Sequence, residues 1–235
     1  NVSQFIPPAK TRYIMNNNPI IMEQSEITAL NRFFAKIYGY VAVGVGLSAL
    51  VAYLSLTVFF EATLNLVMGG RFVIWGIMIA EIALVLFAST AAAKNSPMAL
   101  PLFIAYSALN GFTISIVLWA YTGETVLLSF VTAVGMFAVM AIIGATTKKN
   151  LSAMGQALIA ALIGVIIASV VNMFLQSSGM SYIISLISVV IFAGLIAYDN
   201  QRIRYVFEET GGNVQEGWAI SLALQLYLDF VNLFL

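Results

Sequence analysis

The sequence predicts an all-α integral membrane protein, folded as a bundle of seven transmembrane helices. Of its 235 residues, 61% are hydrophobic and only 9% are charged, which is too little polar surface to cover a soluble domain. The apolar residues also gather in runs of about 18 or more, the length at which a helix crosses a bilayer. These runs lack the alternating pattern of an outer-membrane β-barrel, so helices are the expected spanning element.

The chain opens with a polar segment, 1–35, which Pro7, Pro8 and Pro19 interrupt. This segment lacks the charged, apolar and cleavage-site order of a signal peptide, so we expect a cytoplasmic tail followed by an uncleaved first span. Short connections separate the apolar segments that follow, and we find no separate soluble domain. Within the transmembrane domain 36–235, the expected spans are 37–60, 72–93, 98–121, 125–147, 151–175, 181–204 and 218–235.

Basic residues predict the orientation of these spans. Cytoplasmic loops of membrane proteins are enriched in Lys and Arg. With the N-terminus in the cytoplasm, the opposite side carries only Arg71. The cytoplasmic side carries the other nine basic residues, which are Lys10, Arg12, Arg32, Lys36, Lys94, Lys148, Lys149, Arg202 and Arg204. The last span ends with the chain at Leu235, and we expect the natural protein to extend beyond both ends of this sequence.

The composition excludes several classes of function. The net charge is zero, so nucleic-acid binding has no electrostatic support. The chain has no Cys, which removes thiolate metal sites and cysteine nucleophiles, and no His, so a pH response must come from carboxylates. Phosphate-binding loops, serine-hydrolase elbows and zinc-protease motifs are absent from the sequence. We therefore predict neither an enzyme nor a resident cofactor.

Three acidic residues fall inside the expected spans: Glu81, Asp199 and Asp229. At a rise of about 1.5 Å per residue, Glu81 and Asp229 lie near the middle of the membrane. No Lys or Arg lies at the same depth. A carboxylate in hydrocarbon is costly unless it has a partner. These side chains must therefore be protonated, share protons, face water or hold a cation.

Asp199 and Asp229 are predicted to form a pair. A turn at 211–213, "GGN", would join their two spans and place Asp199 about 16 Å up one arm and Asp229 about 22 Å up the other. Polar residues at helical spacing continue these faces and predict a common interior route. They are Ser221, Gln225 and Asn232 in the last span, Ser181, Ser185 and Ser188 in the sixth, and Ser169, Asn172 and Gln176 in the fifth.

Paired carboxylates predict a sensor of pH. Two such groups in a low-dielectric site cannot both ionise freely, so they titrate as one coupled unit. A shared proton would hold the sixth and seventh spans together. Its loss would leave repulsion, or a place where Asp199 and Asp229 bind a hard cation such as calcium through oxygen ligands. We expect support for this site from four polar residues, Glu81, Gln225, Asn232 and Arg202.

Structural roles compete with this interpretation. Asp199 could form a local salt bridge with Arg202 near the helix end. Glu81 could simply make a hydrogen bond across helices, and Asn172 and Asn232 could hold helices together in the same way. Small residues at close-packing spacing predict tight helix contacts in the first two spans, at Gly39, Gly44, Gly46, and Gly76 with Ala80.

The residues around the acidic positions resemble a known family. "AYDNQRI" at 197–203 and "LALQLYLDFVNLFL" at 222–235 are similar to bacterial members of the Bax inhibitor motif family of membrane proteins. "IAEIALVL" at 79–86 fits the second helix of that family, and the resemblance extends from about Asn31 to the end. It implies a seven-helix fold with the C-terminal helix central. It also implies a pH-sensitive calcium leak, sensed by paired aspartates that match Asp199 and Asp229.

This chain departs from the family in one feature. Some relatives carry a basic cluster at the cytoplasmic end of the second helix, which can bond to the aspartates. In this chain that end reads "STAAAK" and supplies only Lys94, which puts such a latch in doubt.

The expected function is therefore a pH-sensitive calcium leak channel in the lipid bilayer of a bacterial inner membrane, closed by protonation. One alternative is a proton-coupled transporter that uses the same carboxylates as proton carriers. The chain has no matching pair of Gly- or Pro-broken helices, which weakens that alternative. A second alternative is a non-transporting regulator of a membrane protease or another membrane protein, with segment 1–35 as the contact.

Overall fold

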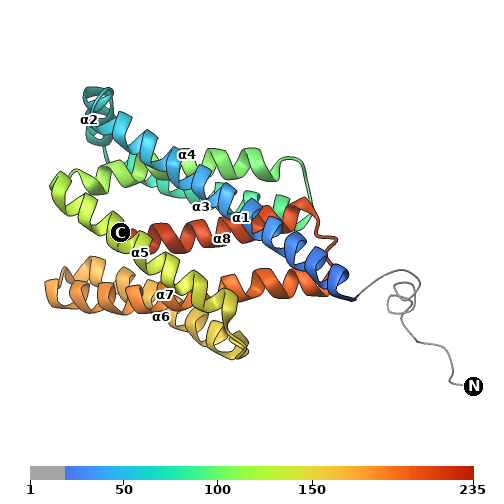
Figure 1. Ribbon diagram of the computed structural model, residues 1–235. Coiled ribbons are helices and arrows are strands. Elements are labelled where there is room, and N and C mark those ends of the chain that lie inside the picture. The colour runs from blue at the N-terminus through green and yellow to red at the C-terminus, as the bar shows by residue number, and fades with distance from the viewer. Residues whose placement is uncertain (1–18) are drawn as a thin grey trace, which may run out of the picture.

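The computed structural model describes residues 19–235, and every regular element in that range is an α-helix. Seven of these helices are long and apolar enough to cross a membrane, and only α2 is too short. The all-α, seven-span fold class predicted from the sequence is thereby confirmed. The helices are α1 (Pro19–Leu56), α2 (Phe60–Met68), α3 (Arg71–Ala93), α4 (Ala99–Leu118), α5 (Gly123–Thr146), α6 (Ser152–Leu175), α7 (Ser178–Glu209) and α8 (Glu216–Phe234) (Figure 1).

The predicted spans agree with helices α3 to α8 to within a few residues at each end. The largest difference is in α1, which begins at Pro19 and therefore includes much of the segment predicted as a polar tail. Proline is well tolerated in the first turn of a helix, where its missing N–H has no acceptor to lose. Further along, Phe33 and Ile37 are buried against α7 and α8, which explains why the helix starts early. Residues 1–18 of the predicted tail lie outside the described residues.

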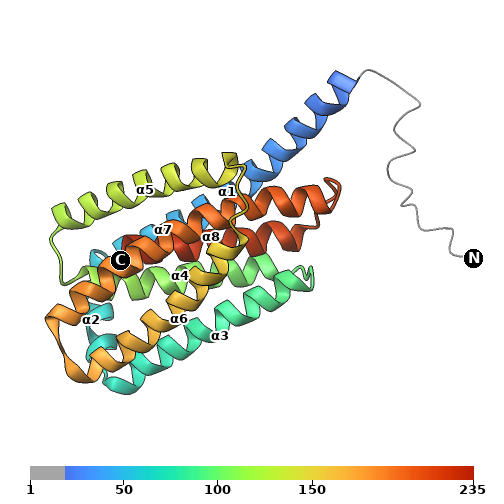
Figure 2. The same ribbon diagram turned by 90° about the horizontal axis from the view of Figure 1, so that it is seen from below.

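The spanning helices alternate in direction, so their connections gather at two ends of the bundle (Figures 1 and 2). One end holds the α3–α4, α5–α6 and α7–α8 connections and carries Lys94, Lys148 and Lys149. We call it the basic end. The opposite end, which we call the far end, holds α2 and the C-terminus of α8. The sequence did not reveal α2, because its apolar residues continue the pattern of the first span.

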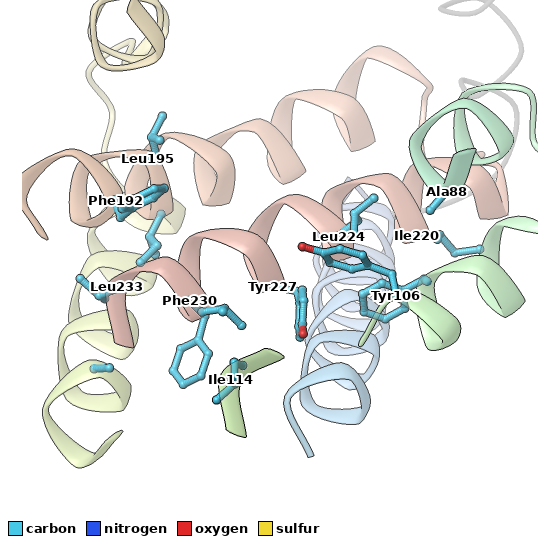
Figure 3. Close-up of a cluster of buried hydrophobic side chains, with 14 of the residues drawn as sticks. Ala88, Tyr106, Ile114, Phe192, Leu195, Ile220, Leu224, Tyr227, Phe230 and Leu233 are labelled. Carbon is cyan, nitrogen blue, oxygen red and sulfur yellow. The ribbon is translucent and has the colours of Figure 1, made fainter. Parts of the chain in front are cut away.

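Helix α8 is the most buried of the spans. In its apolar window 67% of the residues are buried, whereas no other span exceeds 33%. It packs against α1, α3, α4, α5 and α7. Side chains of α8 such as Leu224, Tyr227 and Phe230 enter the main hydrophobic cluster (Figure 3), and Leu222 and Leu226 enter a second cluster near the basic end. Helix α8, and with it Asp229, is therefore surrounded by other helices.

Glycines allow the closest contacts between helices. A Cβ atom on Gly144 of α5 would lie 2.0 Å from the carbonyl oxygen of Ala197 on α7, so only glycine fits there. Of the glycines predicted to make such contacts, Gly44 does so, against Phe103 and Tyr227. The prediction is wrong for three others, because a Cβ would meet nothing within 4 Å at Gly39, Gly46 and Gly76. Spacing alone does not tell which face of a membrane helix meets a neighbour.

Candidate functional site

A tight turn joins the two helices that carry the paired aspartates. Gly211 and Gly212 have φ angles of 60° and 78°, which glycine adopts without strain. The N–H of Gly212 donates to the carbonyl of Phe207 (2.9 Å) and that of Gly211 donates to Glu208 (3.1 Å), which is the Schellman pattern of a helix C-terminus. The turn predicted at 211–213 is therefore present, and α7 and α8 form a hairpin.

This hairpin brings Asp199 and Asp229 together inside the bundle. They lie about 15 Å from the end of α7 and about 20 Å from the start of α8, which is nearly the same depth. Both residues are only 7% exposed, and their carboxyl groups are within reach of a side-chain hydrogen bond to each other. In the described residues, the Oδ2 atom of Asp229 is buried without a hydrogen-bond partner. A buried carboxylate oxygen without a partner costs free energy. Such unpaired oxygens are typical of groups that exchange protons or bind cations.

A cavity of about 570 Å³ lies beside the carboxyl pair, between α6, α7 and α8. Apolar residues such as Phe192 and Leu228 form part of its wall. Its polar lining contains five of the six predicted site residues together with two hydroxyls; these are Asp199, Asp229, Arg202, Gln225, Asn232, Ser169 and Ser188.

Arg202 lies on the side of the pair that faces the basic end. Its Nη1 donates to the Oε1 atom of Gln225 across the α7–α8 contact (3.0 Å). Among the described residues, no ion pair joins Arg202 to Asp199, so the local salt bridge considered from the sequence is not formed. The guanidinium charge is nevertheless close enough to attract the Asp199 carboxyl group.

Polar side chains continue from the pair toward the far end. Asn232 and Ser188 line both the first cavity and a second one of about 550 Å³ between α5, α7 and α8. Ser185 joins that second cavity to a third one, of about 450 Å³, between α6 and α7. Asn232, which lines both cavities, donates its Nδ2 to the carbonyl of Leu228 one turn earlier. The predicted polar faces therefore line three neighbouring cavities.

Asn172 is the polar residue whose contacts fit a structural role. Its Nδ2 donates to the hydroxyl of Ser181 (2.7 Å), and its Oδ1 accepts from the N–H of Ser177 (3.1 Å). These bonds hold the end of α6 to the start of α7, as the structural alternative for this residue predicted.

Glu81 is the predicted site residue that the structure does not bring to the pair. It lies on α3, where its Oε1 accepts a hydrogen bond from Asn110 of α4 (3.3 Å). Asn110 in turn accepts from the hydroxyl of Tyr227 on α8 (2.9 Å). Because Tyr227 precedes Asp229 by two residues, the two side chains leave opposite sides of α8. Glu81 thus belongs to a separate polar group behind α8.

Sequence reasoning missed two buried amides next to Asp199. Asn200 is 0% exposed and accepts a hydrogen bond from the hydroxyl of Tyr38 on α1. Gln201 donates to the carbonyl of Lys149 (2.7 Å) and accepts from the N–H of Leu151 (2.8 Å), both in the α5–α6 connection. The run of three polar residues at 199–201 inside an apolar span was the available signal.

The described residues supply few of the oxygen ligands that a firmly held calcium ion takes in proteins. Calcium takes about six to eight oxygen ligands in proteins, commonly with several carboxylates. Within residues 24–235, no group of three or more acidic side chains could hold a metal ion. Two carboxylates, an amide oxygen and hydroxyls would instead offer a weak site with room for water.

The chain is similar to bacterial membrane proteins over nearly its whole length. A protein of Streptococcus pyogenes serotype M1, named as an uncharacterised membrane protein, is 50% identical over 219 residues, which cover 93% of this chain and 95% of that protein. YrjE of Lactococcus lactis subsp. lactis (strain IL1403) is 46% identical over 221 residues, covering 94% of each chain. The inner membrane protein YbhL of Escherichia coli (strain K12) is 38% identical over 211 residues, covering 88% of this chain and 89% of that protein.

Residues 30–235 also match the model of a family described as "Inhibitor of apoptosis-promoting Bax1". The matched region begins inside α1 and includes all the other helices. None of these names refers to an enzymatic activity, and the names of the streptococcal and Escherichia coli proteins agree with the membrane-spanning helices of this chain.

Proposed function

This chain belongs to the family of the inhibitor of apoptosis-promoting Bax1, and from that premise we propose that it is a pH-sensitive calcium leak channel of the bacterial cell membrane. The observation that carries the proposal is the buried pair of Asp199 and Asp229 at the edge of a cavity. A charged group at this depth requires a functional reason, because the membrane interior disfavours it.

The pair would act as the gate through one proton. When Asp199 and Asp229 share a proton, the bond between them ties α7 to α8. When the proton leaves, two negative charges face each other at short range, so they repel and attract a hard cation. Raising the pH therefore favours separation of the helices and cation flux. Lowering the pH restores the proton and reduces the flux.

The polar cavities supply a route to this gate. With the basic end in the cytoplasm, as the distribution of Lys and Arg predicts, calcium would reach the pair from the far end along the cavities that share Ser188 and Asn232. On the cytoplasmic side, the bond between Arg202 and Gln225 would close the route in the protonated form. A positive charge at that point also opposes the passage of cations while the gate is shut.

Reconstitution in liposomes tests this proposal. Calcium entry is followed with an internal dye at about pH 6 and about pH 8, on either side of neutrality. We expect the wild type to leak more at the higher pH. Asp229→Asn removes one of the two carboxyl groups and with it the repulsion that proton loss creates, so its leak should change much less between the two pH values. Glu124→Gln, which neutralises an exposed carboxylate at the start of α5, is the matched control and should keep the wild-type response.

Other results would support the other functions. A wild-type flux that rises on acidification contradicts the gating scheme. Flux that depends on an organic substrate and saturates would indicate a proton-coupled transporter. Absence of flux, together with a membrane protein that co-purifies with Asp229→Asn but not with a variant lacking residues 1–18, which precede α1, would indicate the regulator.

A further inference from the structure

One chain of hydrogen bonds joins α8 to three other helices. The hydroxyl of Tyr227, a residue that is 0% exposed, lies 2.6 Å from the Oγ of Ser48 on α1 and donates to the Oδ1 of Asn110 on α4 (2.9 Å). Asn110 donates onward to Glu81 on α3 (3.3 Å). Ser48 Oγ also lies 2.7 Å from the backbone carbonyl oxygen of Ser107 on α4, so its single proton is donated either to that carbonyl or to the hydroxyl of Tyr227. Consecutive residues in this series of hydrogen bonds lie on different helices.

The packing around Tyr227 leaves its ring no room to move alone. A Cβ on Gly44 of α1 would lie 2.9 Å from the ring, so the ring rests directly on that helix. The rings of Phe103 and Tyr106, both on α4, meet it edge-on with centroids 5.6 Å and 5.9 Å away. Figure 3 shows Tyr106 and Tyr227 side by side in this cluster. A shift of α8 at this point requires a shift of α1 or α4, because close-packed interiors do not yield locally.

A second set of contacts fastens α5, α6 and α7 together. Gln201 and Arg204 of α7 bind backbone groups at the end of α5 and in the α5–α6 connection, and Gly144 of α5 lies against the backbone of Ala197 on α7. Among the described residues, α6 packs chiefly against α7. Asp199 lies on this second set of helices, whereas Asp229 lies on the first.

The contact between the two sets runs along α7 and α8. It contains the carboxyl pair, the bond between Arg202 and Gln225, and the cavity beside them. Its other links include the hydrogen bond from Tyr38 to Asn200, ring contacts of Phe230 with α5, and ring contacts of α1 with Phe207 of α7 and Phe137 of α5. Side-chain hydrogen bonds cross this seam from Arg202 to Gln225 and from Tyr38 to Asn200, so a displacement along it breaks few directional contacts.

We propose that Tyr227 is the positioning residue of Asp229: it holds α8 in one unit with α1, α3 and α4, and the bundle opens by displacement of this unit against α5, α6 and α7. The division into units stands on the contacts above, and its consequence for leak rests on the proposed function.

In the described residues, the titratable or charged groups that face the carboxyl pair are Arg202 and Tyr198 of α7. Those that face Tyr227 are Glu81 of α3 and Tyr106 of α4.

Distances between spin labels test the two units directly. The chain has no Cys, so labels can be attached at single introduced cysteines. Tyr53 on α1, Trp218 on α8 and Tyr182 on α7 are exposed and serve as sites. Between about pH 8 and about pH 6, we expect the distance between positions 53 and 182, which crosses the seam, to change. The distance between positions 53 and 218, which lies within one unit, should stay the same.

Two variants then test the role of Tyr227. Tyr227→Phe keeps the ring and removes the hydroxyl, so we expect a broader distribution of the distance between positions 53 and 218. The ratio of calcium leak at the higher pH to that at the lower pH should fall about three- to tenfold, the scale of one hydrogen bond. Tyr106→Phe is the matched control, because the hydroxyl of this neighbouring tyrosine makes no hydrogen bond within the described residues. It should leave both measurements unchanged.

The possible results separate this inference from the proposed function. A variant Tyr227→Phe with wild-type distances and leak ratio overturns the inference, while pH-dependent leak of the wild type keeps the function. Labels that move as expected in a protein without leak keep the two units and overturn the function. Equal changes in both label pairs overturn the two units. If Tyr227→Phe does not fold, Ser48→Ala removes the other partner of the same hydroxyl and carries the same expectations.

Discussion

At the scale of single residues, Asp199 is positioned by the small and polar side chains beside it. Gly144 lets α5 approach Ala197 so closely that the helices touch through their backbones. Asn200 and Gln201, which follow Asp199, are buried; Asn200 is hydrogen-bonded to α1 and Gln201 to the α5–α6 connection. A buried amide without partners would be costly, so these bonds fix both the rotation and the depth of α7.

The first prediction concerns this contact. Gly144→Ala would place a methyl group 2.0 Å from the carbonyl oxygen of Ala197, so the two helices must separate. We expect the free energy of unfolding to fall by about 1–3 kcal/mol, the usual cost of overpacking, measured by thermal unfolding in detergent. Gly135→Ala on the same helix is the control, because its new Cβ would meet nothing within 4 Å. Equal unfolding temperatures for the two variants would show that the contact between Gly144 and Ala197 does not contribute to the stability of the fold.

At the scale of helices, the α7–α8 hairpin decides whether the two carboxyl groups meet. The turn sets where α8 starts, and contacts with other helices hold that start in place. Glu216 binds both Lys36 and Tyr40 of α1, and the Oδ1 of Asn95 accepts from the N–H of Gly217 (2.8 Å). Because Asp229 lies in the same rigid helix, its depth follows from this fastened first turn.

The second prediction concerns the turn itself. Gly211 has a φ of 60° and no neighbour within 4 Å of its Cβ position, so Gly211→Ala changes the backbone preference and little else. We expect a loss of about 1–2 kcal/mol in unfolding free energy, the cost of the left-handed conformation for an L-residue. Thermal unfolding measures it, with Gly179→Ala at a helical position of α7 as the control. A wild-type stability for Gly211→Ala would contradict a left-handed glycine at this turn.

At the scale of the whole molecule, the bundle presents apolar surface outward and buries the two aspartates of the pair. Helices α3, α5 and α6 have only 6%, 11% and 6% of their apolar windows buried within the protein, so their remaining surface suits contact with lipid. The basic end and the far end then lie on opposite sides of the membrane. The proposed direction of calcium flow depends on which of them faces the cytoplasm.

The third prediction concerns this orientation. Lys148→Cys places one thiol at the basic end, and Tyr121→Cys places one at the far end, in a chain that otherwise has no Cys. In intact cells a membrane-impermeant thiol reagent should label only position 121. Position 148 should react after the membrane is permeabilised, because the basic residues keep that end in the cytoplasm. The reverse pattern would invert the proposed route.

Local features of the sequence were enough to predict the seven spans and the turn between the last two. The length of an apolar run decides whether a helix can cross a bilayer, and a glycine pair decides where a helix stops; neither depends on the rest of the fold. From the turn and the helix rise, the sequence also predicted that Asp199 and Asp229 lie at similar depth. The family resemblance came from the same segments.

Only the tertiary structure decided which faces of the helices meet. In a membrane protein both lipid and neighbouring helices are apolar, so the pattern of hydrophobic residues does not reveal the buried face. For this reason the sequence placed Glu81 with the aspartates, whereas in the structure it lies behind α8. The hydrogen bonds that link Glu81 to Tyr227 through Asn110 could be identified only from the tertiary structure. The chain by itself determined that carboxylates stand inside the membrane; the packing of the helices determined that two of them share a cavity and the third does not.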